Sequence, residues 1–73
     1  MKTVLVFKTS VTNPGQISRI SPLLNNLMEK SERWNFDLED CDNILRVEAI
    51  SLQAAAIINN LNRAGFSCVE LED

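Results

Sequence analysis

The chain changes from strand to helix character within Ser10-Val11-Thr12-Asn13-Pro14-Gly15-Gln16, and this stretch decides the first half of the fold. Asn13 is a favoured helix N-cap, Pro14 suits the first helical position, and Gln16 can complete a capping box three residues after the cap. We therefore expect a capped helix that begins at Pro14, and we favour capping over metal binding for Asn13 and Gln16.

The segment before this loop predicts a β-strand. Thr3 to Thr9 holds four consecutive apolar residues, β-branched or aromatic in three cases. Such a run is typical of a strand in the interior of a sheet. Because side chains alternate along a strand, Leu5 and Phe7 would face the core, while Val4 and Val6 would face the other side.

The segment after the loop predicts one kinked helix that ends near Ser31. Its apolar residues recur at helical spacing on one stripe, which comprises Ile17, Ile20, Leu24, Leu27 and Met28. Pro22 lies within the segment, and a proline inside a helix removes one backbone hydrogen bond and kinks the axis. The alternative is a separate turn over residues 14–20, followed by a second helix start at Ser21-Pro22.

Residues 34–39 and 44–49 predict a β-hairpin. The first run alternates apolar and polar side chains, which is typical of a half-buried strand. Asp40-Cys41-Asp42-Asn43 between the two runs has the composition of a turn. We favour a solvated turn over a calcium site for Glu39 and the acidic residues that follow it.

The rest of the chain predicts a second helix and a final strand. Ser51 is the expected N-cap of the helix and Gly65 ends it. The apolar face of this helix would comprise Leu52, Ala55, Ile58 and Leu61. Residues 66–71 would form the last strand, with Val69 and Leu71 pointing inward.

The predicted order is strand, helix, strand, strand, helix, strand, in a single domain over residues 1–73. Right-handed crossovers fold this order into one four-stranded antiparallel sheet with both helices on one face, the α+β ferredoxin-like sandwich. We expect the strand order 4-1-3-2. Three connections would then meet at one end of the sheet: the loop at 10–16, the turn around Cys41, and Ala64-Gly65-Phe66.

The composition argues against several classes of function. The 73 residues carry 7 basic and 10 acidic side chains, a net charge of −3, whereas nucleic acids and anionic membranes need a basic surface. No stretch approaches the roughly 20 apolar residues of a membrane span, and the N-terminal run lacks a signal-peptide cleavage site. We therefore expect a cytoplasmic protein. There is no histidine and no nucleophile–base pair, so we predict neither an enzymatic activity nor a cofactor.

With this order of elements, the chain resembles, nearly end to end, the heavy-metal-associated domains of copper chaperones and metal-pumping ATPases. That family places Met-Thr-Cys-x-x-Cys after its first strand, where this chain has Val11-Thr12-Asn13-Pro14-Gly15-Gln16. Thr12 matches, and Asn13 and Gln16 stand where the two thiolates would be. Ala64-Gly65-Phe66 resembles the family's Ala-Gly-Tyr/Phe turn, so the resemblance implies that the Phe66 ring lies beside the loop. Pro22 and the segment 31–34 depart from the family pattern.

The resemblance implies a scaffold that has lost its metal ligands. Copper(I) is a soft ion that paired thiolates hold, and neutral amide oxygens cannot replace them. Cys41 and Cys68 are the soft ligands that remain. Strands about 4.8 Å apart would separate them across the sheet, so we favour two free thiols over a relocated metal site.

One predicted surface suggests a partner. The sheet face away from the helices would carry Val4, Val6 and Ile44 at its centre. Charged residues would surround them: Lys2, Lys8, Arg46, Glu48, Asp37 and Glu70. An apolar centre with a rim of mixed charge is typical of a contact surface.

These features predict a non-enzymatic interaction or regulatory module that binds a protein partner, or a second copy of itself, through the sheet face. One alternative is a working copper or zinc carrier or sensor that uses Cys41, Cys68 or residues of a partner. Another is a small-molecule-binding regulatory domain, which this fold also hosts.

Overall fold

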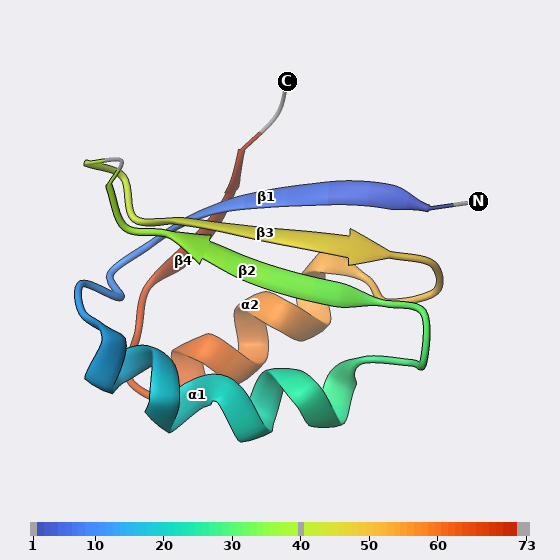
Figure 1. Cartoon of the computed structure of the whole chain (residues 1–73), viewed down its shortest axis with the longest axis horizontal. Helices are drawn as coiled ribbons and strands as arrows, with labels where there is room; N and C mark the ends of the chain where they lie inside the picture. The colour runs from blue at the N-terminus through green and yellow to red at the C-terminus, as the bar shows by residue number, and fades with distance from the viewer. Residues whose placement is uncertain (1, 40, 72–73) are drawn as a thin grey trace.

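The computed structural model describes residues 2–39 and 41–71. Its elements, in chain order, are β1 (Thr3–Thr9), α1 (Pro14–Leu27), β2 (Arg33–Asp37), β3 (Ile44–Ala49), α2 (Ala54–Arg63) and β4 (Cys68–Leu71). The four strands form one antiparallel sheet in the order β2-β3-β1-β4, and both helices cover the same face of it (Figure 1). This is the predicted α+β ferredoxin-like fold, with β2 and β4 at the two edges.

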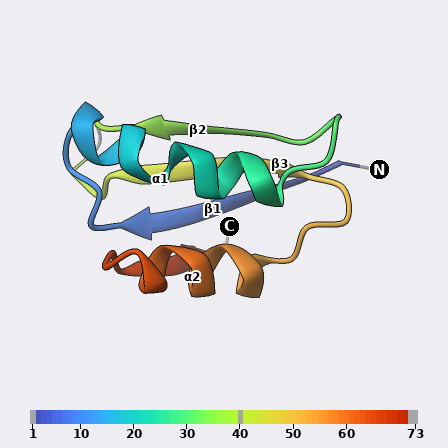
Figure 2. The same cartoon turned by 90° about the horizontal axis from the view of Figure 1, so that it is seen from below.

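The core lies between the helices and the inner face of the sheet. In Figure 2, α1 runs over the half of the sheet that contains β2 and β3, and α2 covers the opposite half. The largest fully buried side chains come from all these layers and are Phe7, Val11, Ile20, Leu24, Leu45, Val47, Ile57 and Leu61. Burial of each such side chain contributes about 1.5–3 kcal/mol to folding.

The facing predicted for β1 is confirmed. Phe7 is fully buried, Leu5 packs against the core from a half-buried position, and Val4 is 57% exposed on the opposite side. By alternation, Val6 shares the side of Val4. We call this side of the sheet, away from both helices, the open face.

The facing predicted for β4 is wrong. Val69 and Leu71 lie on the open face beside Val6, and they are 58% and 37% exposed. The physical reason is the turn before the strand. Phe66 enters the core directly after α2, and the two-residue period of a strand then keeps Cys68 on the inner face.

α1 is a single helix with Pro22 inside it, as predicted, but it ends before Met28 rather than near Ser31. Met28 already has extended backbone angles, φ −82° and ψ 138°. Beyond it, the N–H of Glu29 donates to the carboxylate of Glu32 over 2.9 Å. A side chain therefore organises the connection from α1 to β2.

The prediction of Ser51 as the cap of α2 is wrong. Gln53 occupies the N-cap position and makes no side-chain capping bond, while the N–H of Ser51 donates to the carboxylate of Glu32 over 3.1 Å. The buried face of α2 also differs from the prediction, because Ile57 is fully buried and Ala55 is exposed. None of the helices in the described residues has the length and apolar content of a membrane-spanning segment.

Candidate functional site

The three predicted connections do meet at one end of the sheet. The hydroxyl of Thr9 donates to the carbonyl of Asn43 over 2.7 Å and accepts from the N–H of Val11 over 3.2 Å. Ser10 donates its N–H to the carbonyl of Ser67 over 3.2 Å, and Ser67 donates its N–H back to the Ser10 hydroxyl over 2.9 Å. These bonds join the end of β1 to the hairpin turn and to the start of β4.

Asn13 caps α1, as predicted, but Gln16 does not complete the predicted capping box, because its side chain accepts from Thr12 rather than from the N–H of Asn13. Asn13 Oδ1 accepts from the N–H of Gln16 over 2.9 Å. Gln16 Oε1 accepts from the N–H of Thr12 over 2.7 Å and from its hydroxyl over 3.1 Å, so this side chain reaches one residue beyond the cap. Val11 is fully buried beneath the loop, and Phe66 is 9% exposed within the core. The side-chain oxygens of Asn13 and Gln16 are therefore both engaged within the loop itself.

Cys41 and Cys68 are both free thiols, in different environments. Cys41 is exposed in the hairpin turn, whereas Cys68 is buried on the inner face of β4. Burial raises the pKa of the Cys68 thiol to about 11. Within residues 2–39 and 41–71, no three Cys, Asp or Glu side chains are grouped so that they could hold a metal ion.

The open face carries an apolar patch that differs from the predicted one. We define the patch as Val4, Val6, Val69 and Leu71, which come from the adjacent strands β1 and β4. Ile44, predicted as part of the interface, is only 5% exposed and cannot offer a contact area. It lies on the open face between Lys8 and Asp37.

Ion pairs surround the patch on the open face. Lys2 pairs with Glu48 at 3.8 Å, Lys8 with Asp42 at 3.6 Å, and Arg46 with Asp37 at 3.6 Å. All these side chains are roughly half exposed, so each pair contributes little to stability. Glu70 was also predicted at the rim, but it lies opposite Phe7 in the register of β1 with β4 and therefore on the inner face of the sheet. The charges remain available to a partner.

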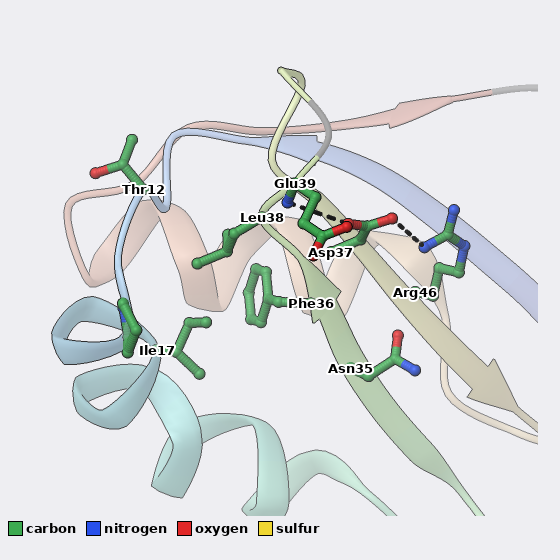
Figure 3. Close-up of a pocket in the computed structure, with 9 residues that line it drawn as sticks. Thr12, Ile17, Asn35, Phe36, Asp37, Leu38, Glu39 and Arg46 are labelled. Atoms are coloured by element: carbon green, nitrogen blue, oxygen red, sulfur yellow. Dashed lines mark hydrogen bonds and ion pairs between the residues drawn. The ribbon is translucent and has the colours of Figure 1, made fainter.

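An open groove of about 690 Å³ lies between the start of α1 and the edge strand β2. In Figure 3 the side chains of Ile17, Phe36 and Leu38 form its apolar wall. Asp37 lies on the opposite side, where it pairs with Arg46 and accepts a hydrogen bond from the N–H of Glu39 over 3.2 Å. No sequence pattern indicated this groove, because it joins segments about twenty positions apart in the chain.

Glu32 is a residue whose importance the sequence did not reveal. Its carboxylate accepts the N–H of Glu29 at 2.9 Å and those of residues 50–52 at 2.7, 3.1 and 3.0 Å. It is 5% exposed and joins the α1–β2 connection to the β3–α2 connection. A glutamate in a charged connection carries no periodic signal, so nothing in the sequence distinguishes it from a solvated neighbour.

Comparisons with known proteins identified no relative. The chain matches no family model, no curated protein and no solved structure. Three features of the described residues are candidates for function: the capped loop before α1, the apolar patch of the open face, and the edge strand β2 with its groove.

Proposed function

We propose that this chain is a non-enzymatic interaction module that binds a protein partner through the open face. The observation that carries the proposal is the patch, in which Val4 and Val69 are each more than half exposed. Single exposed apolar side chains are common on protein surfaces, but contiguous groups on a flat face are typical of contact sites. The patch spans two hydrogen-bonded strands, so its side chains are held in one plane.

The charges around the patch define the chemistry of the partner. Cations and carboxylates alternate on the open face, so a partner with an apolar centre and charges of both signs would fit it. A strongly basic or acidic polymer would meet as many repulsive as attractive groups. This supports a protein partner rather than nucleic acid or a membrane surface, and we propose that the two proteins meet in the cytoplasm.

We further propose that the scaffold descends from a soft-metal carrier that has lost its ligands. The support is the loop before α1, where Asn13 caps the helix and Gln16 accepts from the N–H of Thr12, at the two positions that the resemblance assigns to thiolates. With its two amide oxygens committed to backbone donors, the loop offers no soft donor for copper(I).

The open face can be tested by quantitative capture of partner proteins from a cytoplasmic extract. We expect Val4→Lys and Val69→Lys to lose the captured protein while the far-ultraviolet circular dichroism stays unchanged. Ser18→Lys, on the exposed outer side of α1, is the matched control and should retain it. Equal capture by all variants would place the contact elsewhere.

A second measurement separates this function from a metal carrier. Reduced protein is mixed with copper(I) in the presence of a competing chelator, and bound metal is measured. We expect no stoichiometric complex. If one survives the chelator, the carrier function is correct, and Cys41→Ser and Cys68→Ser would then locate the ligand.

A further inference from the structure

We propose that the chain forms a symmetric dimer in which β2 pairs antiparallel with β2 of a second copy, with the twofold axis at Asn35. The strand reads Arg33-Trp34-Asn35-Phe36-Asp37, and its chemistry is complementary to itself when the direction is reversed. This contact is separate from the open-face patch and does not depend on the proposed function.

The free side of β2 is available for such pairing. β2 is an edge strand, and in the described residues its strand neighbour is β3. In Figures 1 and 2, β2 runs along the outer border of the sheet. An edge strand presents unpaired N–H and C=O groups on its free side, and these are a template for another strand.

The proposed register matches every residue of β2 with a suitable partner. Antiparallel pairing about Asn35 places Arg33 opposite Asp37 of the second copy, and the symmetry repeats this ion pair at the other end. Trp34 then faces Phe36 of the second copy, again twice. Opposite charges and aromatic pairs are the cross-strand pairs that stabilise antiparallel sheets, and an isologous contact requires this reciprocity.

The two kinds of pair lie on different faces of the sheet. Register with β3 places Trp34 and Phe36 on the inner face and Arg33, Asn35 and Asp37 on the open face. A twofold axis perpendicular to the sheet keeps these faces together, so aromatic meets aromatic and charge meets charge. Within a single chain, the rings of Trp34 and Phe36 already contact edge to face, with centroids 5.9 Å apart.

Hollows beside β2 offer space for the side chains of the second copy. The groove next to Ile17 and Phe36 lies where Trp34 of the second copy would arrive. A smaller hollow, next to Met28 and Trp34, lies where Phe36 of the second copy would arrive. Arg33 is exposed and has no ion-pair partner among residues 2–39 and 41–71, so the dimer would supply its carboxylate.

The other edge of the sheet lacks this self-complementarity. β4 reads Cys68-Val69-Glu70-Leu71, and because opposed residues must share a face, its symmetric registers centre on Val69 or on Glu70. The first places the Glu70 carboxylate opposite the buried Cys68, and the second places it opposite Glu70 of the second copy, where like charges destabilise the pair. Of the two edges, β2 is therefore the one suited to a second copy of this chain.

Charge reversal tests the proposed register. Arg33→Asp leaves two carboxylates along the edge, and Asp37→Arg leaves two guanidinium groups, so each variant would meet like charges in its own dimer. We expect each change to weaken dimerisation by about 10-fold or more in sedimentation equilibrium. An equimolar mixture of the two variants should restore dimerisation to within about 3-fold of wild type, since every pair is then complementary.

The charge-reversal experiment has a control variant and three results that would contradict the dimer. Val6→Lys is the control on the open face and should leave dimerisation unchanged, which keeps this test separate from that of the proposed function. A wild-type protein that stays monomeric at its highest soluble concentration would overturn the proposal. So would folded charge-reversal variants that dimerise as wild type, or a mixture that fails to recover.

Cross-linking tests the twofold axis directly. In a Cys41→Ser background, Asn35→Cys should form an intermolecular disulfide on oxidation, because opposed residues of antiparallel strands have Cα atoms about 4.5–5.5 Å apart. Arg33→Cys is the matched control, since its own copy would lie four residues along the partner strand, about 13 Å away. Equal cross-linking at the two positions would contradict the register.

Discussion

The carboxylate of Glu32 is bound by backbone groups from two connections that lie far apart in sequence. The N–H of Glu29 contributes most to its lowered pKa, followed by those of Ile50, Leu52 and Ser51, and together they bring the pKa from 4.5 to about 2. Charge-assisted bonds of this kind favour the ionised form. A single side chain thus fixes both the end of α1 and the approach to α2.

We predict that Glu32→Gln destabilises the fold at neutral pH, more than any other single exchange of a carboxylate for an amide. Because the folded-state pKa lies below the unfolded value, the ionised group stabilises the fold above about pH 4.5. This contribution disappears as the pH falls through 2. The difference in unfolding free energy between wild type and variant, from urea titrations at several pH values, should therefore shrink between pH 4.5 and 2.

The neighbouring exchange Glu29→Gln is the control for this measurement. The Glu29 side chain is exposed, and the Glu32 carboxylate is bound by its backbone N–H rather than by its side chain. The free energy of unfolding of the Glu29→Gln variant should therefore follow that of wild type across the pH range. A Glu32→Gln protein as stable as wild type at pH 7 would show that the four hydrogen bonds do not hold the connections.

The two thiols should react at very different rates. At pH 8 a thiol with a pKa of about 11 is on the order of 0.1% ionised, and the thiolate is the reactive form. We expect iodoacetamide to modify exposed Cys41 at least about 100-fold faster than Cys68, as resolved by mass spectrometry. The Cys41→Ser variant isolates Cys68, and rapid labelling of that variant in its folded state would contradict its burial.

At the scale of elements, α1 depends on the side chain that precedes it. Asn13→Ala removes the bond to the Gln16 N–H, and loss of a helix N-cap costs about 1 kcal/mol. We expect this loss in the free energy of unfolding by urea denaturation. Asn26→Ala, the same exchange at an exposed site within α1, should leave stability unchanged or slightly raised, because alanine favours helix.

The proposed ancestry of the loop makes a prediction about metal. The double change Asn13→Cys with Gln16→Cys places two thiols at a helix N-terminus, which favours their ionised form. We expect one copper(I) per chain by metal analysis. Pro14→Gly as a third change relieves the fixed backbone angle between the thiols. If neither variant binds copper and both stay folded, the likeness to metal carriers reduces to a shared fold.

At the scale of the whole molecule, the sheet separates a core face from an open face. We predict that Val6→Lys leaves the fold intact, while Phe7→Lys unfolds it, since Phe7 is fully buried and an unpaired buried charge is costly. Circular dichroism during thermal denaturation compares the two variants. Unfolding by Val6→Lys would mean that the strand faces the other way, because a shift of one residue exchanges the two faces.

The two proposals combine in a simple geometry. Pairing through β2 would join two sheets edge to edge and leave both open faces on the same side of the dimer. The two patches lie on β1 and β4, away from the β2 contact, so they would stay accessible. A dimer would then present two equivalent contact surfaces to one partner, which strengthens binding when both can engage at once.

Local sequence patterns determined much of the fold. The cap at Asn13, the helix end at Gly65 with φ 94°, and the alternation of β1 all follow from backbone chemistry over a few residues. The order of elements then leaves few topologies, because crossovers are right-handed and connections are short. This is why the sheet order was predictable from the sequence alone.

The tertiary structure decided which side chains face outward and which contacts join distant segments. Val69 and Leu71 have the apolar character of core residues, yet the turn that buries Phe66 directs them to the open face. Glu32 accepts hydrogen bonds from backbone groups about twenty positions away, so Ser51 donates to this carboxylate and Gln53 occupies the N-cap of α2. The periodicity of a strand shows that its side chains alternate, but it does not show which set faces the core. Burial of the Glu32 carboxylate depends on N–H donors that only folding brings together.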